Sequence, residues 1–319
     1  ADGNSPPTVE LRSRLNAANV VLHHRLMRAE GWVPCANDLH RVAGDRVRLW
    51  LGRLLVERLE RKTLEVEELY RRLGNDPDET FHHMLLRGFG LKVNTEAFAM
   101  LANALPVKVL KRYRGDALRV EALLFGQAGL LEGEFQDEYP RRLQAEHRLL
   151  AHLHGLRAVP SVAWKFGRLR PSNFPTVRIA QLARLIDAPT DLMNLMLYYE
   201  DPERIIKELC LSADGYWEDH YRFDHTSAPR MKRLGKDAAM GLVINTVVPF
   251  LFAMGRIRGH EPSRDRALRM LEQLPPEHNA VTEGWRVLGL AADSAAMGQA
   301  LIELKNRHCS ERRCLFCAI

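Results

Sequence analysis

The chain has 319 residues, a formal net charge of +6, 46% hydrophobic residues and 27% charged residues. This composition is close to that of soluble globular proteins, and it excludes disorder and a coiled coil. No apolar run approaches the ~18–20 residues that cross a bilayer, and residues 1–7 lack the basic and apolar parts of a signal peptide. Five cysteines are too few for a disulfide framework, which fits a reducing compartment. The sequence therefore predicts a cytoplasmic protein without a membrane partner.

The beginning of the chain differs from the rest. Pro6 and Pro7 predict a turn that leads into a short extended piece, and an isolated strand cannot bury itself. We therefore expect residues 1–12 to be the tail of a missing N-terminal region. Residues 13–319 are expected to form a helical domain, which is long enough for a subdivision near 155–175.

From residue 13 onward the pattern is helical. Asp45 is expected to cap a helix at 46–73, in which apolar residues recur at helical spacing and after which Gly74 marks the end. Further helices are expected at 78–86, 95–105, 117–125, 138–153, 175–186, 202–209, 236–254, 263–274 and 294–308. No run alternates strongly with period two. The predicted fold class is mainly α, a multi-helix globular array with a short extended N-terminal segment and a C-terminal cysteine knuckle.

Two prolines refine this prediction. Pro175 fits the first position of its helix, where a missing N–H group costs nothing. Pro249 instead lies inside the apolar run 242–252, so that helix is expected to kink or break just before it.

Three of the five cysteines, Cys309, Cys314 and Cys317, lie in the last eleven residues. The short spacing between the last two places both sulfurs on a tight turn, and Cys309 can join them from the end of the preceding helix. Thiolates gathered in this way are typical of metal sites. The alternative is that they are buried reduced thiols, because free cysteine is among the most buried residue types.

A tetrahedral zinc site or a 4Fe-4S cluster needs a fourth ligand. Cys35 is the best candidate, because it follows Pro34 outside any predicted helix. Cys210 and His308 are the alternatives, although Cys210 ends an apolar helical stretch and His308 is adjacent to Cys309. The sequence does not distinguish zinc from an iron–sulfur cluster.

A basic segment occupies residues 147–186, which contain no acidic residue and seven Lys or Arg residues. Interleaved aromatic and guanidinium groups within it can stack on bases and clamp phosphates of DNA or RNA. The predicted nucleic-acid contacts are Trp164, Lys165, Arg168, Arg170, Asn173 and Arg178. The alternative is an ordered loop whose arginines pair with carboxylates elsewhere in the fold.

The segment 216–225 contains Asp219, His220, Asp224 and His225, which could bind a metal or exchange protons. Its aromatic and acidic residues also lie at helical spacings, so an amphipathic helix explains most of the pattern. The chain contains no Walker loop, no dinucleotide-binding glycine motif, no Gly-x-Ser-x-Gly and no His-Glu-x-x-His. No complete catalytic motif is therefore present.

Several longer runs carry a family resemblance. They include Ile-Asn-Thr-Val-Val-Pro at 244–249, the runs at 53–62, 121–129 and 168–183, and the cysteine-bearing end at 309–319. In these runs the chain resembles an uncharacterised bacterial family, domain-of-unknown-function family 2851. The resemblance also implies a cysteine at the position of Cys35.

Members of that family usually carry a further N-terminal region that looks like the acidic core of restriction-type nucleases. The runs that mark this region, Gly-Pro-Asp-Phe and Val-Glu-Ile-His, are not found in this chain, and residues 7–11 resemble its last strand. The resulting hypothesis is that the chain is the helical portion of a nuclease-like protein that associates with nucleic acid. In this hypothesis a metal or a cluster staples the helical portion. One alternative is a non-enzymatic structural or interaction module with a structural zinc site. Another is an enzyme that uses Asp219, His220 and His225.

Overall fold

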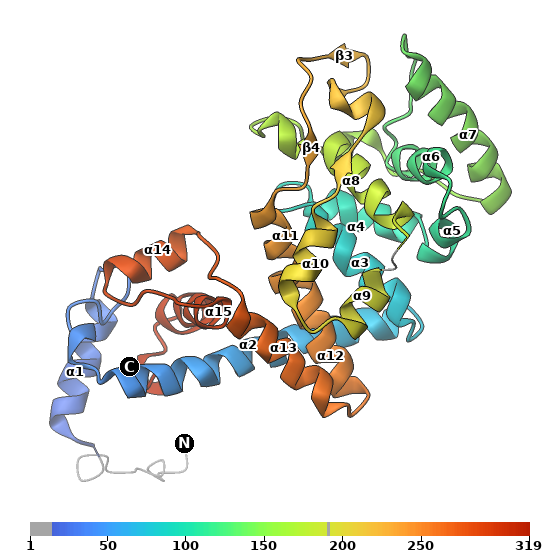
Figure 1. Cartoon of the computed structure of the whole chain (residues 1–319). Coiled ribbons are helices and arrows are strands. Elements are labelled where there is room, and N and C mark those ends of the chain that lie inside the picture. Colours follow the sequence, from blue (N-terminus) through green and yellow to red (C-terminus); the bar gives the residue numbers. More distant parts are fainter. Residues whose placement is uncertain (1–14, 190–191) are drawn as a thin grey trace, which may run out of the picture. The chain divides into compact units, whose positions relative to one another are not determined.

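The computed structural model describes residues 15–189 and 192–319, and it is mainly α-helical, as the sequence predicts (Figure 1). The expected extended tail at 1–12 lies outside the described residues. The chain divides into two compact units. Ala1–Arg58 and Pro275–Ile319 form one, here called the terminal unit, and Leu59–Leu274 form the other, the central unit. Residues 155–175 lie within the central unit.

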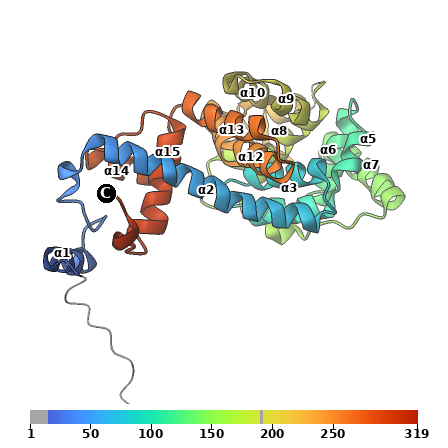
Figure 2. The same cartoon turned by 90° about the horizontal axis from the view of Figure 1, so that it is seen from below.

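The terminal unit combines helices from both ends of the chain, as the blue and red ribbons in Figure 2 show. Its helices are α1 (Ala17–Arg28), the first half of α2 (Gly44–Arg72), α14 (Ala280–Val287) and α15 (Ala295–Glu303). A π-helical turn, Leu304–Cys309, continues α15, and short 3-10 turns lie at Leu39–Arg41 and Cys314–Phe316.

The core of the terminal unit is built around Trp285, which is fully buried. Its indole N–H donates to the Leu301 carbonyl at 3.0 Å, and its ring packs edge-on against Trp32 with centroids 5.2 Å apart. The Arg58 side chain then joins α2 to α15 by donating from Nε to Gln299 Oε1 at 2.7 Å. Helices from opposite ends of the sequence therefore share one core.

Helix α2 begins and ends close to the predicted bounds of 46–73. Asp45 lies in its first turn and pairs with Arg48 at 2.6 Å, so the expectation that Asp45 caps the helix is wrong. Gly74 has a φ of +69°, a conformation that glycine adopts without strain, and it follows the helix as predicted.

The central unit holds most of the helices. They are the second half of α2, α3 (Pro77–Phe89), α4 (Thr95–Ala104), α5 (Val107–Arg112), α6 (Ala117–Gln127), α7 (Glu138–His154), α8 (Pro175–Asp187), α9 (Leu192–Tyr198), α10 (Pro202–Leu209), α11 (Lys236–Leu242), α12 (Val248–Ile257) and α13 (Glu261–Gln273). The predicted helices all overlap observed ones. The sequence pattern does not predict α5 and α9, which are short, nor α1 and α14 in the terminal unit.

Helix α8 is among the deeply buried helices of the central unit. Pro175 occupies its first turn as predicted, and almost every residue up to Leu185 is buried. It packs against α6, and α6 in turn packs against α7. The crossing of α6 and α7 depends on Gly126, because a Cβ atom there would lie 2.0 Å from Cγ of His147.

The segment 216–225 is not an amphipathic helix, and that expectation is wrong. It forms a 3-10 turn, Gly215–Glu218, followed by the strand pair β2 (His220–Arg222) and β3 (His225–Thr226). The ring of Trp217 is fully buried and stacks on Phe125, with centroids 5.1 Å apart. Asp224 has a φ of +58°, which a helix does not allow. A second short sheet pairs β1 (Ser212–Ala213) with β4 (Lys232–Arg233).

The helical stretch Lys236–Ile257 runs without a break through α11, a π-helical segment at Val243–Val247, and α12. The expected break before Pro249 therefore takes the form of a π turn, whose altered bonding accommodates the missing N–H group. This stretch is long and apolar enough to cross a membrane by length and composition, which corrects the expectation that no run would be. Because 83% of its most apolar window is buried inside the protein, it is the core helix of the unit.

Candidate metal centre

The four cysteines predicted as metal ligands all belong to the terminal unit. Cys35 lies in the turns between α1 and α2, and Cys309 is the last residue of the π turn after α15. Cys314 opens the final 3-10 turn and Cys317 follows it directly. All four are free, half-buried thiols.

These four thiols act on one another electrostatically. Burial, followed by the charges of Cys317 and Cys314, raises the pKa of Cys35 to about 11. Burial, followed by the charges of Cys35, Cys317 and Cys314, raises the pKa of Cys309 well above its ordinary value. Burial also raises the pKa of Cys314 and of Cys317. Because such interactions fade with distance, the structure brings Cys35 into the neighbourhood of the three C-terminal cysteines.

Cys317 is also surrounded by N–H groups. The backbone N–H of Ile319 and the indole N–H of Trp50 both lower the pKa of Cys317, against the effect of burial. Trp50 is 7% exposed, and its Nε1 finds no hydrogen-bond partner of ordinary geometry among the described residues. A thiol sulfur is a weak acceptor, whereas a thiolate bound to a metal accepts N–H groups readily. The two N–H groups near Cys317 thus offset part of the effect of burial, which still raises the pKa of the thiol.

Among residues 15–189 and 192–319, no group of three or more His, Cys, Asp or Glu side chains is arranged as a metal site. The four sulfurs therefore share one region without meeting at coordination distance. Their chemistry nevertheless fits a thiophilic metal, because thiolates are the ligands of structural zinc and of iron–sulfur clusters. A bound cation would also offset the repulsion among four thiolates.

Arg312 fixes the C-terminal turns to the N-terminal part of the terminal unit. Its guanidinium donates to the backbone carbonyls of Leu26 at 3.1 Å, Met27 at 2.5 Å and Ala29 at 2.9 Å. These carbonyls lie at the end of α1, where helix carbonyls lack partners and a cation is favoured. The contact holds the final 3-10 turn, which begins at Cys314, against the end of α1.

His308, an alternative fourth ligand, lies beside this group. Its ring packs edge-on against Trp50 with centroids 5.6 Å apart, and its Nε2 lies 3.8 Å from Oε2 of Glu57. Its Nδ1 is buried without a hydrogen-bond partner in the described part of the chain. His308 therefore forms part of the wall around Trp50.

In the basic segment, three of the six predicted nucleic-acid contacts serve the fold. Trp164 is buried and donates its indole N–H to the Ala128 carbonyl at 2.6 Å. Arg178 is buried and donates to Asn173 Oδ1 at 2.7 Å and Gln181 Oε1 at 3.0 Å, and burial lowers its pKa to about 10. Burial corrects the expectation that Trp164 and Arg178 face a nucleic acid, whereas Asn173 is half-buried and its contact stays a prediction. Among the described residues, amide oxygens and no carboxylate bind the Arg178 guanidinium, so the alternative of a carboxylate partner does not apply to it either.

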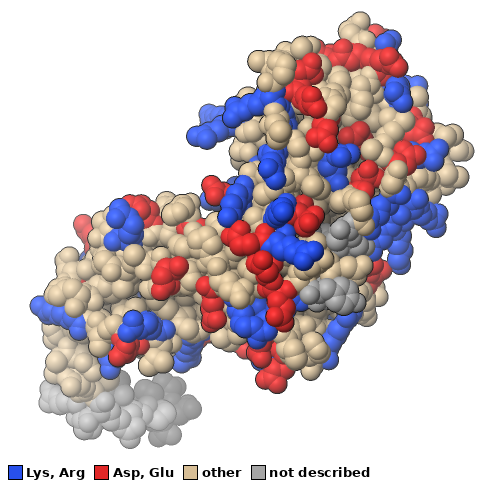
Figure 3. Space-filling view, viewed as in Figure 1, with Lys and Arg blue, Asp and Glu red and all other residues tan. Residues whose placement is uncertain are grey.

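The other three predicted contacts, Lys165, Arg168 and Arg170, are exposed. Their side chains form no ion pair with any residue that the structure describes. Nearby, the guanidinium of Arg222 lies 4.5 Å from the ring centroid of Phe166 and 4.9 Å from that of Phe174. Basic and acidic side chains are interspersed on the face shown in Figure 3, so this face carries no extended field of one sign.

A family model described as "Protein of unknown function (DUF2851)" matches residues 1–280. The chain belongs to this family. The family inferred from the runs between residues 53 and 249 is thereby confirmed, whereas the run at 309–319 lies outside the match. The match ends before Cys309, so the three C-terminal cysteines of this DUF2851 member lie beyond the matched residues. No curated protein and no solved structure matches the chain.

The histidines and carboxylates of segment 216–225 come together only in part in this DUF2851 member. Asp219 Oδ1 lies 2.6 Å from Nδ1 of His220, and the His220 ring stacks on Tyr216. Asp224 instead accepts two backbone N–H groups, from Gln136 at 3.0 Å and Asp137 at 2.9 Å, which fix the loop before α7. His225 is exposed on β3, where its backbone lies opposite Arg222 and not opposite His220.

The sequence did not indicate two further neighbours of His220. Asp137 Oδ2 lies 3.5 Å from Nε2 of His220 and accepts from the Tyr216 hydroxyl at 2.6 Å, while Thr226 Oγ1 lies 3.4 Å from the same Nε2. Asp137 is too distant in sequence for any spacing to reveal this contact. The buried imidazole of His220 thus lies between the carboxylates of Asp219 and Asp137. These contacts join the β2–β3 pair to the start of α7.

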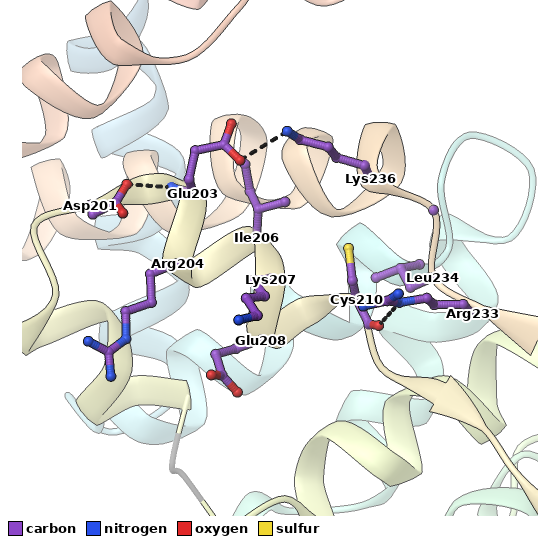
Figure 4. A pocket seen from close by; sticks show the side chains of 11 residues that line it. Asp201, Glu203, Arg204, Ile206, Lys207, Glu208, Cys210, Arg233, Leu234 and Lys236 are labelled. Carbon is purple, nitrogen blue, oxygen red and sulfur yellow. Dashed lines mark hydrogen bonds and ion pairs between the residues drawn. The ribbon is translucent and has the colours of Figure 1, made fainter.

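Cys210, the other alternative ligand, belongs to the central unit, where it follows α10. It lines an open groove of about 800 Å³ along α10 and the start of α11 (Figure 4). Several charged groups of this groove have partners: Lys236 pairs with Glu203 at 3.0 Å, and Arg233 donates to the Cys210 carbonyl at 2.6 Å. Burial raises the pKa of the Cys210 thiol, so it is a poor nucleophile.

Proposed function

We propose that the protein is a helical scaffold whose C-terminal end is fastened to its N-terminal part by a metal centre with four thiolate ligands. The proposed ligands are Cys35, Cys309, Cys314 and Cys317. The observation that carries the proposal is the mutual effect of these thiols on their pKa values, which supports a common site for residues from opposite ends of the chain.

The metal would act as a structural closure. When bound, a zinc ion or a 4Fe-4S cluster supplies thiolate coordination that cross-links distant segments. Trp50 and the Ile319 N–H group would orient and stabilise the Cys317 thiolate, and Arg312 would hold the C-terminal turns against α1. The four cysteines, the Trp50 indole and the Arg312 contacts together favour a structural metal site that closes the terminal unit. They do not favour an open metal site that a substrate could reach.

Single Cys→Ser variants test this proposal, with Cys210→Ser as the matched control. Each is purified without oxygen, and its metal content is compared with that of the wild-type protein. We expect a substantial loss of bound metal for Cys35, Cys309, Cys314 and Cys317, and no loss for Cys210. Equal metal content in Cys35→Ser and Cys210→Ser would show that Cys35 is not a ligand.

We propose, as a second function, that the exposed part of the basic segment binds single-stranded nucleic acid. Lys165, Arg168 and Arg170 supply exposed cations that no described carboxylate neutralises. The stack of Arg222 with Phe166 and Phe174 adds aromatic and guanidinium surfaces of the kind on which bases stack.

Binding of a fluorescent oligonucleotide at several salt concentrations tests the second proposal. Each phosphate contact contributes about −0.7 to the slope of log K against log salt for a single strand. Three or four contacts therefore predict a slope of about −2 to −3. Binding that does not depend on salt would exclude this interface.

A further inference from the structure

The central unit contains a second groove, whose volume is about 770 Å³. This volume is within the range of about 300–1,000 Å³ that is usual for small-molecule sites. Residues of the second half of α2, of α3, of one face of α4 and of the π segment Val243–Val247 line it. Four elements that are separate in sequence thus converge on one hollow.

The π segment distinguishes this groove from an ordinary surface depression. π turns inside helices are rare and are frequent at functional sites. Here the turn places Asn245 and Thr246 on the groove wall, within a helical stretch that is otherwise apolar. Gly88 of α3 lies directly against it, because a Cβ atom at Gly88 would come within 2.8 Å of the Thr246 hydroxyl oxygen.

Beside the π segment, α3 presents a row of polar side chains. Glu79, His83 and Arg87 are four residues apart and therefore lie on one face of the helix. His83 lines the groove although it is only 4% exposed, and its Nε2 lies 3.6 Å from Oε1 of Glu79. Glu79 is itself held by the backbone N–H of Val107 at 3.0 Å.

Two guanidiniums of the groove are not neutralised within the described part of the chain. Arg87 of α3 and Arg72 of α2 are exposed, and neither forms an ion pair with a described residue. The third cation, Lys62, pairs with Glu65 at 3.0 Å. The remaining acids of the lining are Glu68 and Glu96, both of them exposed. Arg72 and Arg87 come from different helices, as expected for groups that hold an oxyanion between them.

We propose that this groove binds a small molecule that carries an oxyanion, either a phosphate ester or a carboxylate. Arg72 and Arg87 hold the oxyanion, His83 and Thr246 provide polar groups at the groove wall, and the π segment shapes the wall that faces α3. The proposal does not depend on the metal centre or on nucleic-acid binding, since it uses none of their residues.

Isothermal titration of the full chain with inorganic phosphate and, separately, with succinate tests the proposal. The informative variants are Arg72→Gln and Arg87→Gln. Arg71→Gln is the matched control, because Arg71 is exposed on the same turn of α2 as Arg72 and does not line the groove. All three substitutions are at surface positions, and circular dichroism checks that each variant is folded.

We expect the wild-type protein to bind one of the two anions. The affinity for that anion should be at least about tenfold lower in Arg72→Gln and Arg87→Gln than in Arg71→Gln. Preference for phosphate assigns the groove to phosphate esters, and preference for succinate assigns it to carboxylates. Absence of binding of both anions to the wild-type protein would overturn the proposal. Equal weakening in all three variants would overturn it as well, since the effect would then be one of general charge.

Discussion

The indole N–H of Trp50 acts on the sulfur of Cys317 and lowers the pKa of that thiol, while burial raises it. The indole is itself buried, and among the described residues its nitrogen finds no hydrogen-bond partner of ordinary geometry. This pair links α2 to the last residues of the protein. The N–H groups of Trp50 and Ile319 offset part of the effect of burial on the pKa of Cys317.

Replacement of Trp50 by Phe keeps an aromatic ring at this position and removes the N–H group. If Cys317 is a metal ligand, we expect the variant to bind metal about 10–100-fold more weakly, as is usual when a partner of a ligand is removed. Competition with a chromophoric chelator measures this change. Trp32→Phe is the control, because Trp32 packs on Trp285 in the same unit. Equal affinities in the two variants would contradict a role for Trp50.

Gly126 permits the close crossing of α6 and α7. A Cβ atom there would lie 2.0 Å from Cγ of His147, so we expect Gly126→Ala to lower the free energy of unfolding by about 1–3 kcal/mol or more. Gly52 of α2 is the matched control, since a Cβ atom there meets nothing within 4 Å. Gly52→Ala should stabilise the helix by about 0.5–1 kcal/mol. Urea unfolding followed by circular dichroism compares the two, and a stable Gly126→Ala protein would contradict the described crossing.

His82 makes the stability of the central unit depend on pH. Burial lowers its pKa from 6.5 to about 4, while its Nε2 lies 3.1 Å from the Leu105 carbonyl oxygen. Because the folded-state pKa is the lower one, the unfolded chain takes up the proton first. The contribution of neutral His82 to the free energy of unfolding is therefore fully present above about pH 6.5. It is lost as the pH falls toward 4, by about 3 kcal/mol in total.

Unfolding free energies between pH 4 and pH 7 measure this loss. His82→Gln retains an N–H donor for the Leu105 carbonyl but does not take up a proton in this range. We expect the variant to show a shallower pH dependence than the wild-type protein. Identical slopes would mean that His82 is not the group responsible.

The exposed and the paired cations of the basic segment should behave differently toward nucleic acid. Arg168→Gln and Arg170→Gln should weaken oligonucleotide binding, and each should reduce the magnitude of the salt slope by about 0.7. Arg184→Gln is the control, because Arg184 already pairs with Asp214 at 3.2 Å. Equal effects at Arg168 and Arg184 would indicate attraction by net charge and not by this loop.

Much of the helical architecture could be predicted, because its signals are local. Pro175 and Pro202 occupy first turns of their helices, and the apolar spacing of α2 marks its buried face. Helix α14 also has a local signal that the prediction did not use, a capping box in which Asn279 and Thr282 bond each other's backbone.

Where the prediction was wrong, tertiary packing decided the structure. Segment 216–225 has helical spacings, but Trp217 is held by Phe125 and Asp224 is held by the loop before α7. No local pattern reveals such partners. Pro249 likewise indicated an irregularity, although the sequence did not specify that it would be a π turn.

The sequence indicated the four candidate cysteine ligands but not the residues that surround them. The spacing of the last three cysteines indicated a common site, and Cys35 followed as the cysteine outside any predicted helix. The role of Trp50 required the fold, because it lies on α2, far from Cys317 in sequence. Similarly, aromatic and basic composition could not reveal that Trp164 and Arg178 are buried while Arg168 and Arg170 are exposed.

We propose that a metal centre with cysteine ligands closes the terminal unit. Elemental analysis of anaerobically purified protein, combined with its visible spectrum, tests this claim most directly. We expect either about one zinc per chain with a featureless visible spectrum, or about four irons with broad visible absorption. Protein that is folded and free of both metals under these conditions would contradict the claim.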